Sequence, residues 1–311
     1  MKKTFFTGLI ILIVGGIMLA IGIGKGGVKS VYWDNGLKTD EKITQTREIN
    51  RVDTVKIDAD VYGPVSIHRG NVAKVTVHGN KSDQIKTSVI GNELTISSGA
   101  KTHVMLGDFN TNMGSPKVEV TVPKKTQIKT IDNRREMSLT VADLAIENFK
   151  NTSNGDLNLS NVTISKSLVL PHEIYGDTNM DNVTYNKGLN LNSAGDVTIR
   201  NSRFDQADSR VRSSDGDVIL SHNRWQNLTV TSAQGNLNLE DQDVNNTLTA
   251  DSSNGDVMAR ILPRNSTAIH ASSSNGDTSI YGKSQNNYGK AKSNGQTFQL
   301  NSSNGDVTVT R

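Results

Sequence analysis

The sequence predicts an all-β protein: a β-solenoid, or parallel β-helix-like stack with coils of about 20 residues, preceded by a single N-terminal transmembrane helix. Three observations predict this fold. Hexapeptides close to SSNGDV recur through the second half of the chain, short runs of alternating apolar residues follow them, and an uncharged run of 21 residues stands near the N-terminus. Alternation with period two is typical of strands, and a fixed repeat of this length is typical of stacked coils.

Residues 1–24 are predicted to be a signal anchor with a transmembrane helix over about 4–24. A run of about 20 apolar residues matches the ~30 Å hydrocarbon layer, whereas a secretory signal needs only roughly 7 to 15. An uncleaved anchor is therefore favoured over cleavage after Gly22. The cysteine-free polar tail predicts a single-pass protein of the cell membrane, with an extracytoplasmic C-terminal domain in a Gram-positive-type envelope. The expected partner of the helix is the lipid bilayer.

Residues 25–46 are predicted to be a linker. Within it, Tyr32 and Trp33 either sit at the outer membrane interface or pack on the first β element, and the sequence leaves both open. Residues 1–148 carry 20 basic and 15 acidic side chains. Such an excess attracts anionic lipid or wall polymer weakly and is far from a nucleic-acid signature, so no nucleic acid is expected as a partner.

Residues 47–148 are predicted to be an N-terminal β region. Alternating β-branched residues bounded by Gly, Asn and Pro are strand signals. They occur at 54–58, 65–68, 74–79, 85–97 and 117–123. Residues 101–116 are rich in Gly and Asn without a clear period, which indicates an exposed excursion.

Residues 149–311 are predicted to be SSNGD-type β-strand repeats. The repeat is marked by glycines 19 to 21 residues apart, at Gly155, Gly176, Gly195, Gly216, Gly235, Gly255 and Gly276. An alternating apolar pair follows each glycine, and a further large apolar residue follows in most units, at Ile164, Tyr185, Phe204, Trp225 and Val244. No unit can bury its apolar face alone, so the units are expected to stack about 4.8 Å apart. Asn-Gly is also a hairpin signal, which leaves an antiparallel meander as the alternative.

The hexapeptide is interpreted as a corner of the coil. Glycine is expected to supply a positive φ there, and stacked asparagines are expected to form a ladder, at Asn154, Asn254, Asn275 and Asn304. The alternative is a Ca²⁺-binding column built from Asp156, Asp196, Asp217, Asp256, Asp277 and Asp306. This column offers one carboxylate per coil, whereas Ca²⁺ takes about six to eight oxygens, so the structural interpretation is favoured.

No catalytic, cofactor-binding or metal-binding residue is assigned, no cofactor is expected, and the protein is not expected to be an enzyme. The histidines are scattered without a fixed spacing to a carboxylate, at positions 68, 78, 103, 172, 222 and 270. The densest acidic stretch is EDQD at 240–243, on a predicted loop where solvation explains it. Because some β-solenoids cleave polysaccharides with acidic clusters on one face, a carbohydrate-active enzyme is kept as a further hypothesis.

The alternating N-terminal region, the stretch KVEVTVPKKTQIKTIDN (117–133) and the SSNGDV units together resemble a bacterial family of β-strand-repeat proteins described as candidate adhesins, a domain of unknown function. The resemblance covers 47–311. It implies a non-catalytic surface interaction or adhesion module, with cell-wall glycan, a host surface or membrane proteins as partners. The alternative that it suggests is an accessory membrane protein of the cell-envelope stress response.

Overall fold

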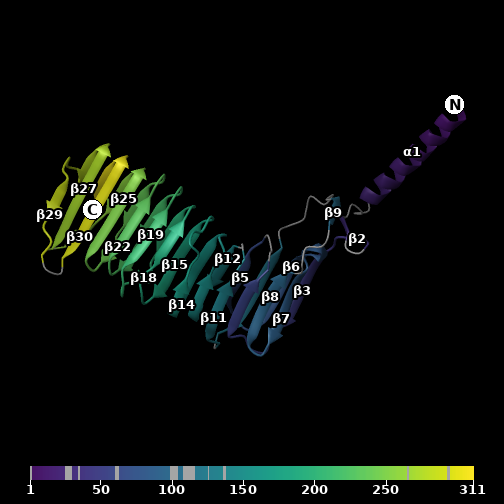
Figure 1. Cartoon of the computed structure of the whole chain (residues 1–311), viewed down its shortest axis with the longest axis horizontal. Helices are drawn as coiled ribbons and strands as arrows, with labels where there is room; N and C mark the ends of the chain where they lie inside the picture. The colour runs from purple at the N-terminus through teal and green to yellow at the C-terminus, as the bar shows by residue number, and fades with distance from the viewer. Residues whose placement is uncertain are drawn as a thin grey trace.

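The computed structural model describes residues 2–24, 30–33, 36–59, 63–98, 104–107, 116–124, 126–135, 138–264, 266–292 and 295–311. Helix α1 (Lys2–Gly24) lies at one end of the molecule, and a long stack of strands runs from it to the far end, where the chain also ends (Figure 1). No helix in the described ranges has both the length and the apolarity that crossing a membrane requires. A transmembrane role for α1 therefore stays a prediction.

The repeat region is a parallel β-solenoid with three sides. In spatial order the first side is formed by β12 (Leu139–Ala142), β14 (Leu157–Val169), β15 (Thr178–Tyr185), β17 (Val197–Arg200), β20 (Val218–Ser221), β23 (Leu237–Glu240), β26 (Val257–Arg260), β31 (Val307–Thr310) and β28 (Thr278–Ile280). The second side holds β13 (Ala145–Asn151), the distal parts of β14 and β15, then β18 (Arg203–Phe204), β21 (Arg224–Trp225) and β24 (Asp243–Val244). The third side holds β16 (Asn190–Ser193), β19 (Ser209–Ser213), β22 (Leu228–Ser232), β25 (Thr247–Asn254), β30 (Gln296–Asn304), β27 (Thr267–Asn275) and β29 (Asn287–Gly289).

Successive coils stack in register, so equivalent residues of the repeat lie directly above one another. Val197 is paired with Val218, and Val218 with Leu237, across parallel strands. The pairs from β12 to β31 on the first side are parallel, as are those from β16 to β30 on the third. This confirms stacked coils of about 20 residues. An antiparallel meander is absent from these pairs.

The core fills the inside of the coils with the alternating residues of each strand. The large residue on the second side is buried in every unit for which the sequence predicts it, and Phe204 and Trp225 are fully enclosed. Their rings stack with centroids 5.0 Å apart. Since neither coil could cover such a ring alone, each aromatic side chain is stabilised by the coil next to it.

The N-terminal β region continues the same stack. Its first-side strands, from the end inwards, are β3 (Lys42–Glu48), β6 (Lys74–Asn80), β10 (Lys117–Pro123) and β5 (Val65–Gly70); its second-side strands are β7 (Ile85–Ile90), β8 (Glu93–Ser98), β4 (Thr54–Asp58) and β11 (Ile128–Asn133). A short 3-10 helix, η1 (Lys81–Asp83), joins β6 to β7. Strand β5 pairs with β12 and β11 pairs with β13, and β13 itself runs across residues 148 and 149. The strand predictions in this region are confirmed, and the stack crosses the predicted boundary without a break.

The predicted linker contains strands. Strand β3 pairs antiparallel with β6, and β1 (Val31–Trp33) lies between β2 (Leu37–Thr39) and β9 (Val104–Gly107). Most side chains of β3 are exposed, so the strand lacks the alternation that marks the others, and backbone pairing alone defines it. Tyr32 is buried whereas Trp33 is half exposed. Of the predicted excursion at 101–116, residues 101–103 and 108–115 lie outside the described residues.

Both ends of the solenoid contain a coil that is out of sequence order. At the far end, β30 lies between β25 and β27, and β31 lies between β26 and β28. The last coil of the chain is therefore inserted between the two coils that precede it in the sequence. At the near end, β4 and β5 lie between strands that follow them in sequence. Antiparallel strands then cover each end, β3 and β7 at one and β29 at the other. Covered ends leave fewer unpaired edges for association with other chains.

Candidate functional site

The first candidate is the corner formed by the repeated hexapeptide, where the sequence places the acidic column. Its glycines are required by space. A Cβ built on Gly235 would lie 2.2 Å from the carbonyl oxygen of Gly216, and one on Gly255 would lie 2.3 Å from that of Gly235. Among the described corner glycines only Gly305 has a positive φ, at 153°. The prediction that glycine supplies a positive φ at this corner is therefore wrong. Glycine is needed here because the backbones of adjacent coils approach too closely to leave room for a Cβ atom.

The serine and the aspartate of the hexapeptide connect successive coils. The buried hydroxyl of Ser213 accepts from the backbone N–H of Gly216 at 3.0 Å and donates to the carbonyl of Gly195 at 3.0 Å. Oδ1 of Asp196 accepts from the N–H of Asp217 at 2.9 Å. The same bond to the next coil recurs from Asp156 through Asp177, Asp196, Asp217, Asn236, Asp256 and Asp306 to Asp277. Each unit of the hexapeptide thus satisfies a backbone group of its neighbour.

The column of aspartates has a structural role that does not depend on charge. Asn236 occupies one of its positions, and its side-chain oxygen accepts from the N–H of Asp256 at 2.8 Å. The predicted asparagine ladder is present for three of its four members, since Asn275 donates to Asn304 and Asn304 donates to Asn254, each at 2.9 Å. Asn154 lies outside it, because Tyr175 is its counterpart in the next coil. These bonds support the structural interpretation of the repeat, because every side chain of the column except Asp277, at its end, already uses one oxygen to accept a hydrogen bond from backbone.

A second corner, between the first and second sides, carries the positive φ values. It is formed by residues one coil apart with φ between 50° and 58°, all exposed except the half-buried Asp241: Asp143, Asn161, Asn182, Asn201, His222 and Asp241. Asn161 donates to Asp143, and Asn182 donates to Asn161, each at 2.8 Å. Asn and Asp tolerate this left-handed conformation better than other side chains with a Cβ. The two corners of one coil thus depend on different properties of their residues.

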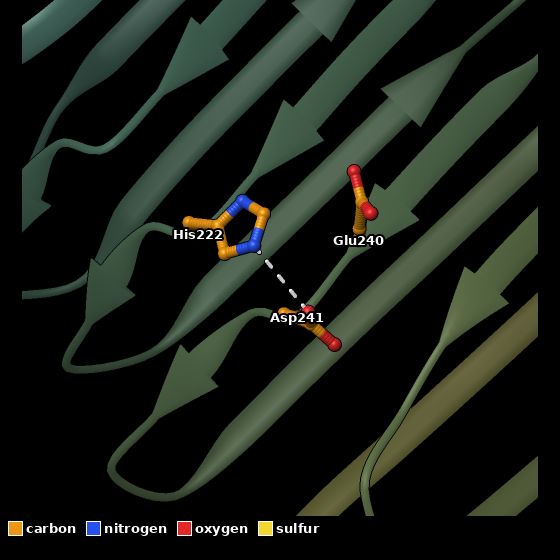
Figure 2. A group of neighbouring side chains, drawn as sticks. All are labelled: His222, Glu240 and Asp241. Carbon is orange, nitrogen blue, oxygen red and sulfur yellow. Dashed lines mark ion pairs between the residues drawn. The ribbon is translucent and has the colours of Figure 1, made fainter. Parts of the chain in front are cut away.

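The second corner brings together the group of titratable side chains drawn in Figure 2, His222, Glu240 and Asp241. Potential metal-ligand atoms of the three residues lie within 4.8 Å of one another. His222 points toward Asp241, with Nε2 3.4 Å from Oδ2. Imidazole and carboxylate groups at this separation are the donor types of a transition-metal site.

A guanidinium already pairs with both carboxylates of this cluster. Nη2 of Arg260 lies 2.9 Å from Oε1 of Glu240 and also contacts Oδ2 of Asp241. A divalent cation would have to displace this charge, since like charges at such a distance repel. Oδ1 of Asp241 is enclosed and has no hydrogen-bond partner in the described part of the chain. The arrangement is therefore an ion-pair network, and it would accept a metal only if Arg260 moved away.

Sequence reasoning missed the proximity of His222 to the EDQD stretch. Asp241 follows His222 by 19 residues, which is one coil. The repeat period alone therefore indicates that these two residues lie close together. The stretch is not a solvated loop. Gln242 is buried and accepts from Trp225 Nε1 at 2.9 Å, and Asp243 pairs with Arg224 at 3.1 Å.

The other histidines are spread along the solenoid. His68 lies 3.4 Å from Glu119, His78 bonds to the Thr44 hydroxyl at 3.1 Å, and His270 bonds to Asn287. The carbonyl of His172 accepts from Asn192. His103 lies outside the described residues.

Comparison with known proteins identifies a family and a set of similar structures. The family model described as Toastrack DUF4097 matches residues 52–310. A candidate adhesin from Bacteroides fragilis NCTC 9343 is 15% identical, with 86% of this chain and 97% of that chain covered and a TM-score of 0.35. A candidate adhesin from Parabacteroides distasonis ATCC 8503 is 10% identical, covering 86% and 97%, with a TM-score of 0.42. A candidate lipid-binding protein from the same strain is 15% identical, covering 85% and 96%, with a TM-score of 0.40. No curated protein matches the chain.

Proposed function

The chain belongs to the Toastrack DUF4097 family, and from its architecture we propose that it is a non-catalytic surface interaction module. The observation that supports this most is the third side of the solenoid. Its outward residues stack in register as rows of polar side chains, for example Arg210, Thr229, Thr249 and Gln299. Such rows repeat about every 4.8 Å along the stack.

The neighbouring row, which contains Asp251, Asn301 and Ser272, is ordered by hydrogen bonds between its side chains, and this favours contact with an extended partner. Next to the first row, Asn301 donates to Asp251 at 2.8 Å and Ser272 donates to Asn301 at 2.8 Å. Side chains that are already ordered lose little conformational entropy on binding. Many weak contacts along one rigid side also act together when the partner is a polymer, because each further contact is intramolecular. A glycan or another extended surface polymer is therefore the proposed partner.

The location of this module at the cell membrane is part of the same proposal. It is supported by the uncharged run Thr4–Gly24, which falls within α1, and by the position of α1 at one end of the molecule, beyond the solenoid (Figure 1). Protease treatment of intact cells tests it. Degradation of the solenoid without lysis is expected, and full protection would contradict an extracytoplasmic location.

The experiment that tests the function is a retention assay with the full-length chain in detergent. Purified wall polymers, host-cell glycans and membrane proteins of the producing cell are immobilised in separate arms. We expect retention on a glycan arm, and we expect the double variant Arg210→Ala, Arg212→Ala on the third side to reduce it. Lys86→Ala is the matched control, because Lys86 is an exposed cation on β7 at the other end.

The outcomes separate the two functions that the sequence suggests. Retention only on membrane proteins of the producing cell would favour the accessory role in the envelope stress response. Absence of retention in every arm would contradict the interaction module. Turnover of a uronate polymer by the chain would contradict the non-catalytic part, and Asp241→Asn would then test whether the cluster near His222 is responsible.

A further inference from the structure

The far end of the solenoid contains an open hollow of about 670 Å³. It is lined by Tyr281, Gly282, Lys283, Gln285, Tyr288, Val309, Thr310 and Arg311. The lining residues come from two coils that are adjacent in space, since the end coil contributes 281–288 and the inserted last coil contributes 309–311. The hollow therefore lies where the end coil meets the last coil of the chain, which is inserted next to it.

A tight turn forms one wall of this hollow. Tyr281 and Gly282 both have positive φ, 54° and 75°, between the bridged residues Ile280 and Lys283. Positive φ at both central residues is the mark of a type I′ turn, which reverses the chain at the end of β28. The end coil therefore turns back directly after its first side, and Lys283 is carried to the rim.

The hollow is positively charged. Lys283 and Arg311 line it, no lining side chain is acidic, and neither side-chain cation forms an ion pair with a side-chain carboxylate among the residues that the structure describes. The sequence from Thr278 to Gly305 contains no Asp or Glu, and it carries Lys290 and Lys292 in addition to Lys283. Unpaired cations around a concave surface favour an anionic ligand.

Two tyrosine rings lie beside these cations. The rings of Tyr281 and Tyr288 meet edge to face with centroids 4.8 Å apart, and the guanidinium of Arg311 lies 4.7 Å from the centroid of Tyr281. Burial raises the pKa of Tyr281, with a smaller contribution from Tyr288, while Arg311 opposes the shift. Its hydroxyl stays protonated and donates to the carbonyl of Ile261 at 3.0 Å. Tyr288 is only partly buried, so part of it remains available to a ligand.

We propose that this hollow binds one acidic sugar unit of a glycan, with Lys283 and Arg311 binding the anionic group and Tyr288 packing against the sugar ring. Its volume lies in the range of small-ligand sites, about 300 to 1,000 Å³. Charged donors supply strong hydrogen bonds to carboxylate or sulfate, and a tyrosine combines an apolar ring with a polar end. The inference rests on the proposed surface interaction function and assigns that function a specific subsite.

Binding of defined oligosaccharides to the full-length chain in detergent tests the subsite. The probes are hyaluronan and heparin oligosaccharides, purified acidic wall polymer, neutral dextran, and polyglutamate as an anion without sugar rings. We expect at least one acidic saccharide to bind, with dextran and polyglutamate much weaker. The double variant Lys283→Ala, Arg311→Ala should raise Kd about tenfold or more. Tyr288→Ala should weaken saccharide binding, and Lys86→Ala should leave it unchanged.

Each result supports or overturns the assignment. Equal binding of polyglutamate and the acidic saccharides would reduce the hollow to a charged patch and overturn the sugar site. Retention on glycans that the hollow variants leave unchanged would overturn the subsite while the proposed function stands, and no retention on any surface would remove both. If Tyr288→Ala does not fold, the double charge variant decides alone. The relative affinities for hyaluronan, heparin and wall polymer distinguish a host source from a wall source.

Discussion

The two corners of one solenoid coil are built from similar residues for different physical reasons. At the glycine corner, the coils approach so closely that a Cβ on Gly235 would lie 2.2 Å from backbone, while the backbone conformation there is ordinary. At the second corner, Asn182 and Asn201 have φ of 53° and 51°, and their exposed side chains bond to the neighbouring coil. A glycine in a repeated turn motif can therefore mark close contact between coils instead of a left-handed backbone conformation.

The largest effect is expected at the glycine corner. Gly235→Ala should lower the free energy of unfolding by about 3 kcal/mol, because backbone on the adjacent coil must move. Gly91→Ala is the matched control, since Gly91 has a φ of 59° and open space around its Cα, and it should cost about 1 kcal/mol. Denaturant unfolding of both variants measures the difference. A greater loss of unfolding free energy for Gly91→Ala than for Gly235→Ala would mean that backbone conformation, and not the space available to a Cβ atom, determines the need for glycine.

A smaller effect is expected at the second corner. Asn201→Ala should cost about 1 kcal/mol, because alanine tolerates the left-handed conformation poorly, whereas Asn201→Gly should stay within roughly 0.5 kcal/mol of the natural chain. Asn179→Ala is the control. Asn179 also donates to a side chain of the neighbouring coil, at 3.1 Å, but has no positive φ. Equal losses for Asn201→Ala and Asn179→Ala would assign the effect to the hydrogen bond alone.

The aspartate column should respond to loss of the acceptor and not to loss of charge. Oδ1 of Asp217 accepts from the N–H of Asn236 at 2.7 Å. Asp217→Ala removes that acceptor and should cost about 1 kcal/mol, whereas Asp217→Asn keeps it and should cost less than about 0.5 kcal/mol. Thermal unfolding of the two variants provides the measurement. Similar destabilisation by both would show that the charge itself is needed.

The smallest effect is expected from calcium. Addition of millimolar Ca²⁺ after chelation should shift the unfolding midpoint by less than about 1 °C, since a cation that does not bind the native state cannot stabilise it. Calorimetry with and without the chelator measures this. A clear rise would revive a metal site, and Asp256→Asn compared with Asp241→Asn would assign it to the glycine corner or to the second corner.

Much of the repeat could be predicted because it is local in the chain. The alternation around Val197 and Ile199 defines a strand with one buried side, and recurrence after about 20 residues implies stacking, since one unit cannot bury that side. The candidate site was less predictable. His222 lies next to Asp241 only because residues one period apart are stacked, and Arg260, which pairs with Asp241, belongs to a third coil.

The sequence alone predicted the strands of the repeat, its period and its buried residues, because these depend on side chains within one unit and its similar neighbours. The strands β1, β2 and β3, in the segment predicted as a linker, were set by backbone pairing with distant segments. Tertiary structure decided the order of the coils at the two ends. Residues 296–310 follow the coil of β27 and β28 in the chain, yet they lie between that coil and the coil of β25 and β26. It also decided the close approach of adjacent coils at the glycine corner, and it placed Lys283 and Arg311 around one hollow. Contacts between distant segments have no counterpart in local pattern, so they become visible only in the folded chain.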